Sequence, residues 1–236
     1  YVARAPDTPS IYEKDVNLTT GLSTQKYLGL DGAHVVMTRT TDTCVSLKDR
    51  FNLFVNYKVN GVSRGVDYAI SIHHDGDVKP GVNYTASYVY LGSCQGTPGN
   101  LAAAVASRQQ VASGLLYKPT NCNRAGVYQD DLQMVREVKP MPSILTEVGF
   151  ITNATEAANL RIPSYIEHNG YAIYAGIVDY LGKVPLPLGS QAPGIISIGT
   201  TANNNPTWLD QVKVQIKGQA SLSFASGPLT VSGRPT

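Results

Sequence analysis

The sequence predicts an α/β fold, with a mostly parallel twisted sheet, helices on both faces and a small C-terminal β-rich segment. Short apolar, β-branched runs alternate with segments of helical periodicity from about residue 13 to residue 182. Strands that alternate with helices usually form a parallel sheet covered on both faces. At Lys183 a Pro-rich stretch begins, and beyond it apolar and polar residues alternate, which is typical of strands.

Residues 1–12 contain two X-Pro pairs and no periodicity, so we expect a loop there. In the first half, helices are predicted over 13–29 and 45–58, and strands over 33–38 and 66–73.

The second half continues the alternation of strands and helices. The pattern predicts, in order, a strand over 82–91, a helix over 98–116, short strands near 127 and 134–135, a strand over 142–148 and a helix over 163–182.

Three parts follow from this pattern: an α/β domain over 1–182, a linker over 183–194 and a β-rich appendage over 195–236. The appendage is too short to be stable by itself, so we expect it to pack on a structural partner or to be an incomplete part of a larger β-domain.

Composition excludes several classes of protein. The net charge of +2 is too small to indicate binding to nucleic acid or to a membrane surface. No apolar run approaches the length of about 18 residues that a transmembrane helix needs. Cys44, Cys94 and Cys122 show no CxxC spacing, which argues against a structural zinc site. Their odd number fits one disulfide plus a free thiol, or a partner cysteine outside this chain.

Three titratable residues lie where elements begin or end: Glu13 at a helix start, and His73 and Glu147 at the ends of strands. Carboxylate and imidazole are zinc ligands, and a nearby carboxylate outside the ligand set can act as a general base. Taken singly, each of the three residues has an ordinary structural interpretation. Glu13, for example, can simply complement the helix dipole at a helix start.

The motifs, taken together and in order, resemble a known family. They are Glu13-Lys-Asp-Val-Asn-Leu18, Val35-Val-Met-Thr-Arg39 with Asp42, Val45-Ser-Leu47 with Arg50, Ser71-Ile-His73, Asn123-Arg-Ala-Gly-Val127 and Pro142-Ser-Ile-Leu-Thr-Glu147-Val-Gly-Phe-Ile-Thr-Asn153 with Glu156. Over roughly residues 11–182 the chain is similar to the zinc-dependent N-acetylmuramoyl-L-alanine amidases of the cell-wall hydrolase and phage-endolysin type.

The resemblance implies a role for each of the three residues. Glu13 and His73 match zinc ligands of the family, and Glu147 matches its catalytic glutamate. The implied reaction is hydrolysis of the amide between N-acetylmuramic acid and L-alanine in peptidoglycan, the expected partner. The expected location is extracellular, cell-wall associated or in a phage virion.

One departure concerns the first histidine ligand, which the family carries in a strand before the position of Glu13. No histidine precedes Glu13 here, and we expect the chain to begin just past that motif. A second departure is His74, which points away from His73 if the strand continues and is expected to be a substrate-side or supporting residue rather than a ligand.

Two alternatives to the amidase hypothesis remain. One is a non-catalytic peptidoglycan-binding or virion component that keeps the fold. The other is a zinc carboxypeptidase-like peptidase, which the order of the motifs fits less well.

Overall fold

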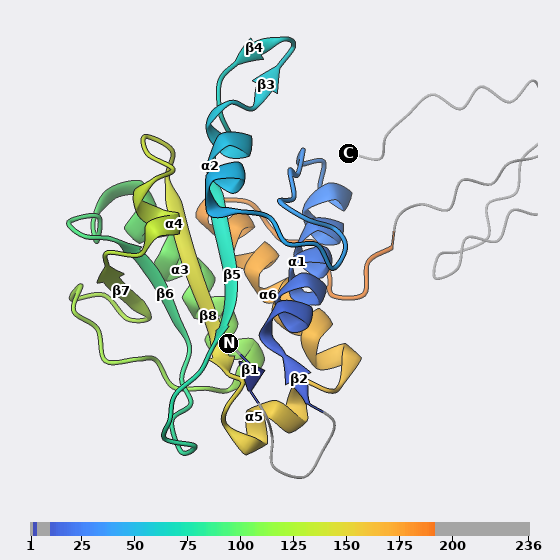
Figure 1. The fold of residues 1–236 in the computed structure, drawn as a ribbon, viewed down its shortest axis with the longest axis vertical. Coiled ribbons are helices and arrows are strands. Elements are labelled where there is room, and N and C mark those ends of the chain that lie inside the picture. The colour runs from blue at the N-terminus through green and yellow to red at the C-terminus, as the bar shows by residue number, and fades with distance from the viewer. Residues whose placement is uncertain (1, 4–9, 192–236) are drawn as a thin grey trace, which may run out of the picture. The chain divides into compact units, whose positions relative to one another are not determined.

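A computed structural model describes residues 2–3 and 10–191, and it contains a central four-stranded sheet (Figure 1). The strands are ordered β5 (Ala69–Asp75), β8 (Ser143–Phe150), β6 (Ala86–Tyr90) and β7 (Val127–Asp130). The pairs β5–β8 and β6–β7 are parallel, whereas β6–β8 is antiparallel. The predicted mixed, mostly parallel sheet is therefore confirmed.

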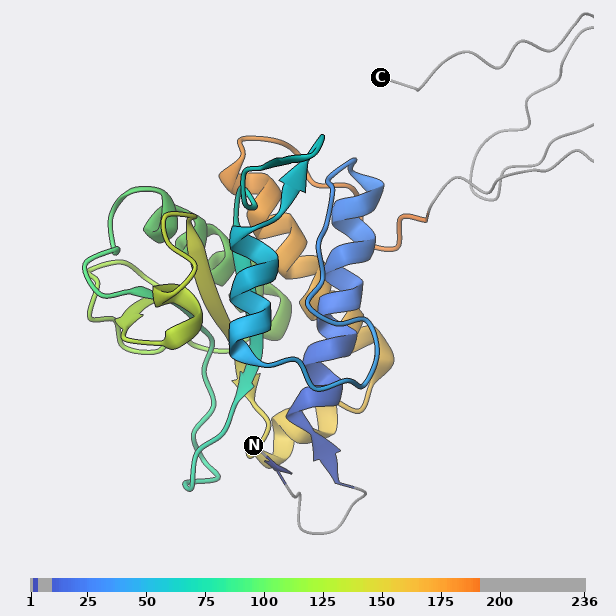
Figure 2. The same cartoon turned by 45° about the horizontal axis from the view of Figure 1, so that its top comes forward.

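Helices cover both faces of this sheet, as predicted. On one side lie α3 (Gly96–Ser113) and α6 (Pro163–Tyr180), with α1 (Glu13–Leu30) packed on α6 and beside β5 (Figures 1 and 2). On the other side lie α2 (Leu47–Val55) and the short α4 (Gln133–Arg136). Within the described residues, no helix is long and apolar enough to cross a membrane.

The period of two along β8 decides which face of the sheet forms the main core. Ile144 and Val148 are buried in one cluster with Leu101 of α3 and Ile173 of α6. Leu145, which points to the opposite face, packs in a separate cluster with residues of β6 and α4. Glu147 has the same parity as Leu145, so its side chain also lies on the face away from the main core.

Glycine allows the close approach of α3 and α6. A Cβ atom at Gly176 in α6 would lie 2.5 Å from the Cα of Val105 and 2.9 Å from the carbonyl oxygen of Ala104, both in α3. Those are backbone atoms of a buried helix, so any side chain at this position would push the two helices apart.

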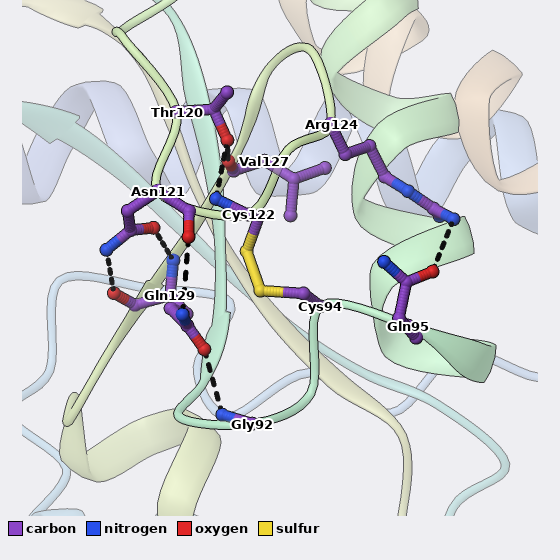
Figure 3. Close-up of a disulfide and its surroundings, with 9 residues drawn as sticks. All are labelled: Gly92, Cys94, Gln95, Thr120, Asn121, Cys122, Arg124, Val127 and Gln129. Carbon is purple, nitrogen blue, oxygen red and sulfur yellow. Dashed lines mark hydrogen bonds between the residues drawn. A yellow bond between two sulfur atoms is a disulfide. The ribbon is translucent and has the colours of Figure 1, made fainter.

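A disulfide joins the loop after β6 to the segment between α3 and β7. Cys94 and Cys122 are bonded, and Cys44 is an exposed free cysteine, which confirms the first of the two cysteine pairings considered above. Figure 3 shows that Gln129 of β7 supports the same junction, because its side-chain oxygen accepts a hydrogen bond from the Gly92 amide at 2.9 Å.

Two predicted strands are wrong. Residues 33–38 have an apolar, β-branched sequence but form no strand, because the sheet ends at β5 and a groove separates them from it. A strand requires a hydrogen-bonded neighbour, which an apolar run cannot supply alone. Residues 134–135 lie in α4 instead of a strand, with Val135 buried under the sheet.

The structure also contains short elements that the sequence did not predict. Residues 1–12 were expected to be loop, but β1 (Val2–Ala3) pairs with β2 (Ile11–Tyr12). The chain also forms a hairpin of β3 (Lys58–Val59) and β4 (Val62–Ser63), and a helix α5 (Ala154–Asn159).

The start of the predicted linker is attached to the helices. The amide of Leu186 donates to the Tyr174 hydroxyl at 2.7 Å, and the amide of Gly189 donates to the Tyr27 hydroxyl at 2.9 Å. The predicted β-rich appendage over 195–236 lies outside the described residues, so the division into three parts stays a prediction.

Candidate active site

Glu13 and His73 come together although 60 residues separate them. Glu13 opens α1, directly after β2, and His73 lies on β5. The His73 Nδ1 atom is 2.8 Å from Glu13 Oε1. Burial alone would raise the pKa of Glu13, but the hydrogen bond and charge of His73 outweigh it and lower that pKa to about 2. Glu13 is therefore ionised at neutral pH, as a metal ligand must be.

Asn17 supports this pair from one turn further along α1. Its amide nitrogen donates to Glu13 Oε1 at 3.0 Å, and its Oδ1 lies 2.8 Å from His74 Nδ1. His74 is fully buried, and burial lowers its pKa to about 3, so it is neutral. His74 thus points away from His73, as expected. It contacts Asn17, which bonds Glu13, and it does not line the groove that Glu13 and His73 share, so we retain only the supporting role expected for it.

Glu147 lies on the neighbouring strand, directly beside His73 in the parallel register of β5 and β8. Its Oε2 atom is buried and has no hydrogen-bond partner among the described residues. Burial raises the pKa of Glu147 well above its usual range, and the negative charges of Asp75 and Glu13 add to this effect. A carboxyl group with a raised pKa holds a proton more strongly than an exposed Glu, which suits a group that must carry a proton to a leaving amine.

Sequence reasoning assigned no role to two charged residues next to Glu147. Asp75 ends β5, and Lys118 lies in the segment after α3; both interact electrostatically with the Glu147 carboxyl group. The sequence marks Asp75 as a residue of chemical interest, because it follows the two histidines at the same strand tip, but it does not show that Asp75 lies beside Glu147. No local pattern marks Lys118, which reaches this face only through the path of the chain after α3.

A groove of about 670 Å³ runs along the open edge of β5. Its walls are formed by α1, residues 36–44, the β5 edge and side chains of α2 and α4, and both Glu13 and His73 line it. Glu147 does not belong to its lining.

The donor set at this site meets the requirements of zinc in part. Carboxylate and imidazole both suit zinc, and a catalytic zinc site uses three protein ligands and one open position. Across residues 2–3 and 10–191, no group of three or more His, Cys, Asp or Glu side chains is arranged to hold a metal ion. Glu13 and His73 therefore fit two of the three ligand positions, and the described residues do not supply the third.

β5 and β8 both continue past His73 and Glu147, to Asp75 and Phe150, so these two residues lie near the strand ends and not at them as expected. These features define an α/β protein with a carboxylate–imidazole pair near the end of β5 and a buried carboxyl group beside it, the donor types that zinc hydrolases use. Residues 3–179 match the family described as N-acetylmuramoyl-L-alanine amidase. The chain belongs to this family.

Relatives and solved structures agree with this assignment. The chain is 28% identical over 170 residues to the N-acetylmuramoyl-L-alanine amidase LytC of Bacillus subtilis, covering 72% of this chain and 31% of LytC. The chain thus spans less than a third of that relative.

Two solved structures share the fold. The catalytic domain of the amidase CwlV from Bacillus (Paenibacillus) polymyxa var. colistinus is 27% identical, with a TM-score of 0.60, over 72% of this chain and 86% of that one. The amidase AmiC2 of Nostoc punctiforme is 27% identical, with a TM-score of 0.61, over 77% of this chain and 91% of that one.

Proposed function

We propose that this chain hydrolyses the amide bond between N-acetylmuramic acid and L-alanine in peptidoglycan, with zinc as cofactor. The observation that carries the proposal is the convergence of Glu13 and His73, with Glu147 beside His73 on the next strand. Family membership supports the choice of substrate, and it favours an amidase over a carboxypeptidase-like peptidase.

Glu13 and His73 would hold the zinc ion, together with a third ligand that the described residues do not supply. When bound, zinc lowers the pKa of a water molecule and polarises the carbonyl group that is attacked. Asn17 and His74 hold Glu13 in place, because the hydrogen bonds of Asn17 fix the carboxylate against α1 and β5.

Glu147 is the proposed proton shuttle. Its buried Oε2 atom accepts the proton of the attacking water and then transfers it to the nitrogen of the leaving L-alanine amine. The Thr85 hydroxyl donates to the Glu147 carbonyl oxygen at 3.1 Å, which fixes the backbone that carries this side chain.

A second candidate function is a peptidoglycan-binding or structural component without catalysis. The specific observation in its favour is that no three-membered metal-binding group occurs among the described residues. The two candidates differ in whether peptidoglycan is cleaved, and an assay can therefore separate them.

The test is release of new L-alanine N-termini from purified peptidoglycan by the zinc-supplemented protein. We expect wild-type protein to release them, and Glu147→Gln to retain zinc while its rate falls by about 10²–10⁴-fold, the usual contribution of general acid–base catalysis. Full activity of Glu147→Gln would remove Glu147 from the mechanism. Binding to peptidoglycan without any release by wild-type protein would establish the non-catalytic function instead.

We also propose an extracellular, cell-wall or virion location. The Cys94–Cys122 disulfide supports it, because such bonds persist in oxidising compartments. The proposed division keeps residues 1–182 as the catalytic domain and 195–236 as a separate β-rich unit. Expressing residues 1–190 alone tests this boundary. If the truncated protein did not fold, the proposed boundary would be wrong.

A further inference from the structure

Lys118 places its ammonium group among three tyrosine rings. Its Nζ atom lies 3.9 Å from the ring centroid of Tyr128, 4.9 Å from that of Tyr88 and 5.6 Å from that of Tyr84. Nζ also donates a hydrogen bond to the Tyr88 hydroxyl at 2.8 Å. Cation–π contacts and the hydrogen bond hold the long lysine side chain in one place.

The backbone connects this lysine to the proposed proton shuttle through Thr85. The Lys118 amide donates to the Thr85 carbonyl at 3.1 Å, and the Thr85 hydroxyl donates to the Glu147 carbonyl. In the register of β6 and β8, Ala86 pairs with Glu147 and Tyr88 pairs with Leu145. Because residues two apart share a face, Tyr88 and Glu147 point to the same side of the sheet.

Lys118 makes no direct ion pair in the part of the chain that the structure describes, although its charge acts on the nearby carboxyl groups of Asp75 and Glu147. The ion pairs found there involve other residues. Burial raises the pKa of the Tyr88 hydroxyl, so that group is neutral and does not cancel the charge. An ammonium group has three N–H donors, and Tyr88 takes only one of them.

We propose that Lys118, held by Tyr88 and Tyr128, binds a carboxylate of the peptidoglycan stem peptide while the amide bond lies at Glu147. This inference rests on the proposed function. Where the residue that follows L-alanine carries a free carboxylate, a fixed ammonium group attracts it as an ion pair, and where that group is a carboxamide it does not. Lys118 would therefore select stem peptides by the amidation state of that residue.

Binding and cleavage are measured with two muramyl-peptide substrates that differ only in carboxylate or carboxamide at that residue. Calorimetric binding of the two corresponding free stem peptides gives a readout that does not depend on catalysis. The variants are Lys118→Met, which keeps an apolar stem of similar length, and Lys118→Arg, which keeps the charge.

Lys139→Met is a matched control. Lys139 also lies over a tyrosine, with Nζ 3.5 Å from the Tyr90 centroid. Tyr90 is at the other end of β6, and β6 runs antiparallel to β8, so this second lysine lies away from Glu147.

We expect the wild type and Lys139→Met to bind the carboxylate peptide about tenfold more tightly than the carboxamide. Lys118→Met should lose this preference through a higher KM for the acid substrate. Its kcat should change by the same factor for both substrates, because Lys118 also acts on the Glu147 carboxyl group. Lys118→Arg should keep most of the preference. Equal binding of both peptides by the wild type, or an unchanged preference in Lys118→Met, would overturn the inference. Failure of the proposed function is seen separately, as absence of cleavage of either substrate.

Discussion

The imidazole of His73 and the carboxylate of Glu13 meet with Nδ1 and Oε1 2.8 Å apart, one from β5 and the other from the first residue of α1. The hydrogen bonds of Asn17 and His74 support this contact from the main-core side of the sheet. The pair is therefore held in place by the fold, and its role in metal binding can be tested directly.

Glu13→Gln should weaken zinc binding, because it removes the anionic donor but preserves its shape. If Glu13 is a direct ligand, its loss should lower zinc affinity by more than 100-fold. If its carboxylate only orients the His73 ring, the loss should lower zinc affinity by about 10–100-fold. Zinc affinity is measured by competition with a chromogenic chelator. Asp15→Asn, an exposed acid in the same first turn, serves as control, and an equal loss in this control would remove Glu13 from the site.

His74→Gln should remove part of the acid sensitivity of folding. Since burial lowers the pKa of His74 to about 3, the unfolded chain binds more protons than the folded one between about pH 6.5 and pH 3. The contribution of neutral His74 to the free energy of unfolding is fully present above pH 6.5. It is lost as pH falls, by up to about 1.4 kcal/mol per pH unit. Urea unfolding of metal-free protein at pH 8, 6 and 5 gives this slope. The prediction fails if the wild type and the variant have the same slope.

Loss of the Cys94–Cys122 disulfide should destabilise the fold. The bond spans 28 residues, and closing a loop of that length corresponds to about 3–4 kcal/mol on the chain-entropy scale. The double variant Cys94→Ser/Cys122→Ser should show this loss in chemical unfolding. Cys44→Ser, at the exposed free thiol, should change stability by less than about 0.5 kcal/mol. Similar stabilities for the wild type and the double variant would show that the disulfide does not contribute to stability.

Gly176→Ala should destabilise the protein by about 1–3 kcal/mol, although alanine is the better helix former. The added methyl group would meet the backbone of α3 at 2.5 Å from the Val105 Cα. Gly29→Ala in α1 is the matched control, because a Cβ there meets nothing within 4 Å. It should be neutral or stabilise by up to about 1 kcal/mol. Thermal unfolding of both variants separates packing from helix propensity, and a stabilised Gly176→Ala would contradict the close-contact argument.

Local patterns predicted most of the helices and the strand that carries Glu147. Helical periodicity located α1 and α6 to within two residues. α1 buries one face, whereas residues 172–178 of α6 are all buried. The apolar runs before His73 and around Glu147 marked β5 and β8, since strands buried on both faces have few polar residues. The same runs marked His73 and Glu147 as candidate residues.

The sequence by itself thus determined the class of fold, the order of its main elements and the residue types at the candidate site. Only the tertiary structure decided whether residues 33–38 form a strand, because strand formation depends on a neighbour in space. It also decided that His74 supports Glu13 and that Lys118 lies near Glu147. These contacts join residues 29 or more positions apart, and no local pattern encodes a contact made by the folding of the whole chain.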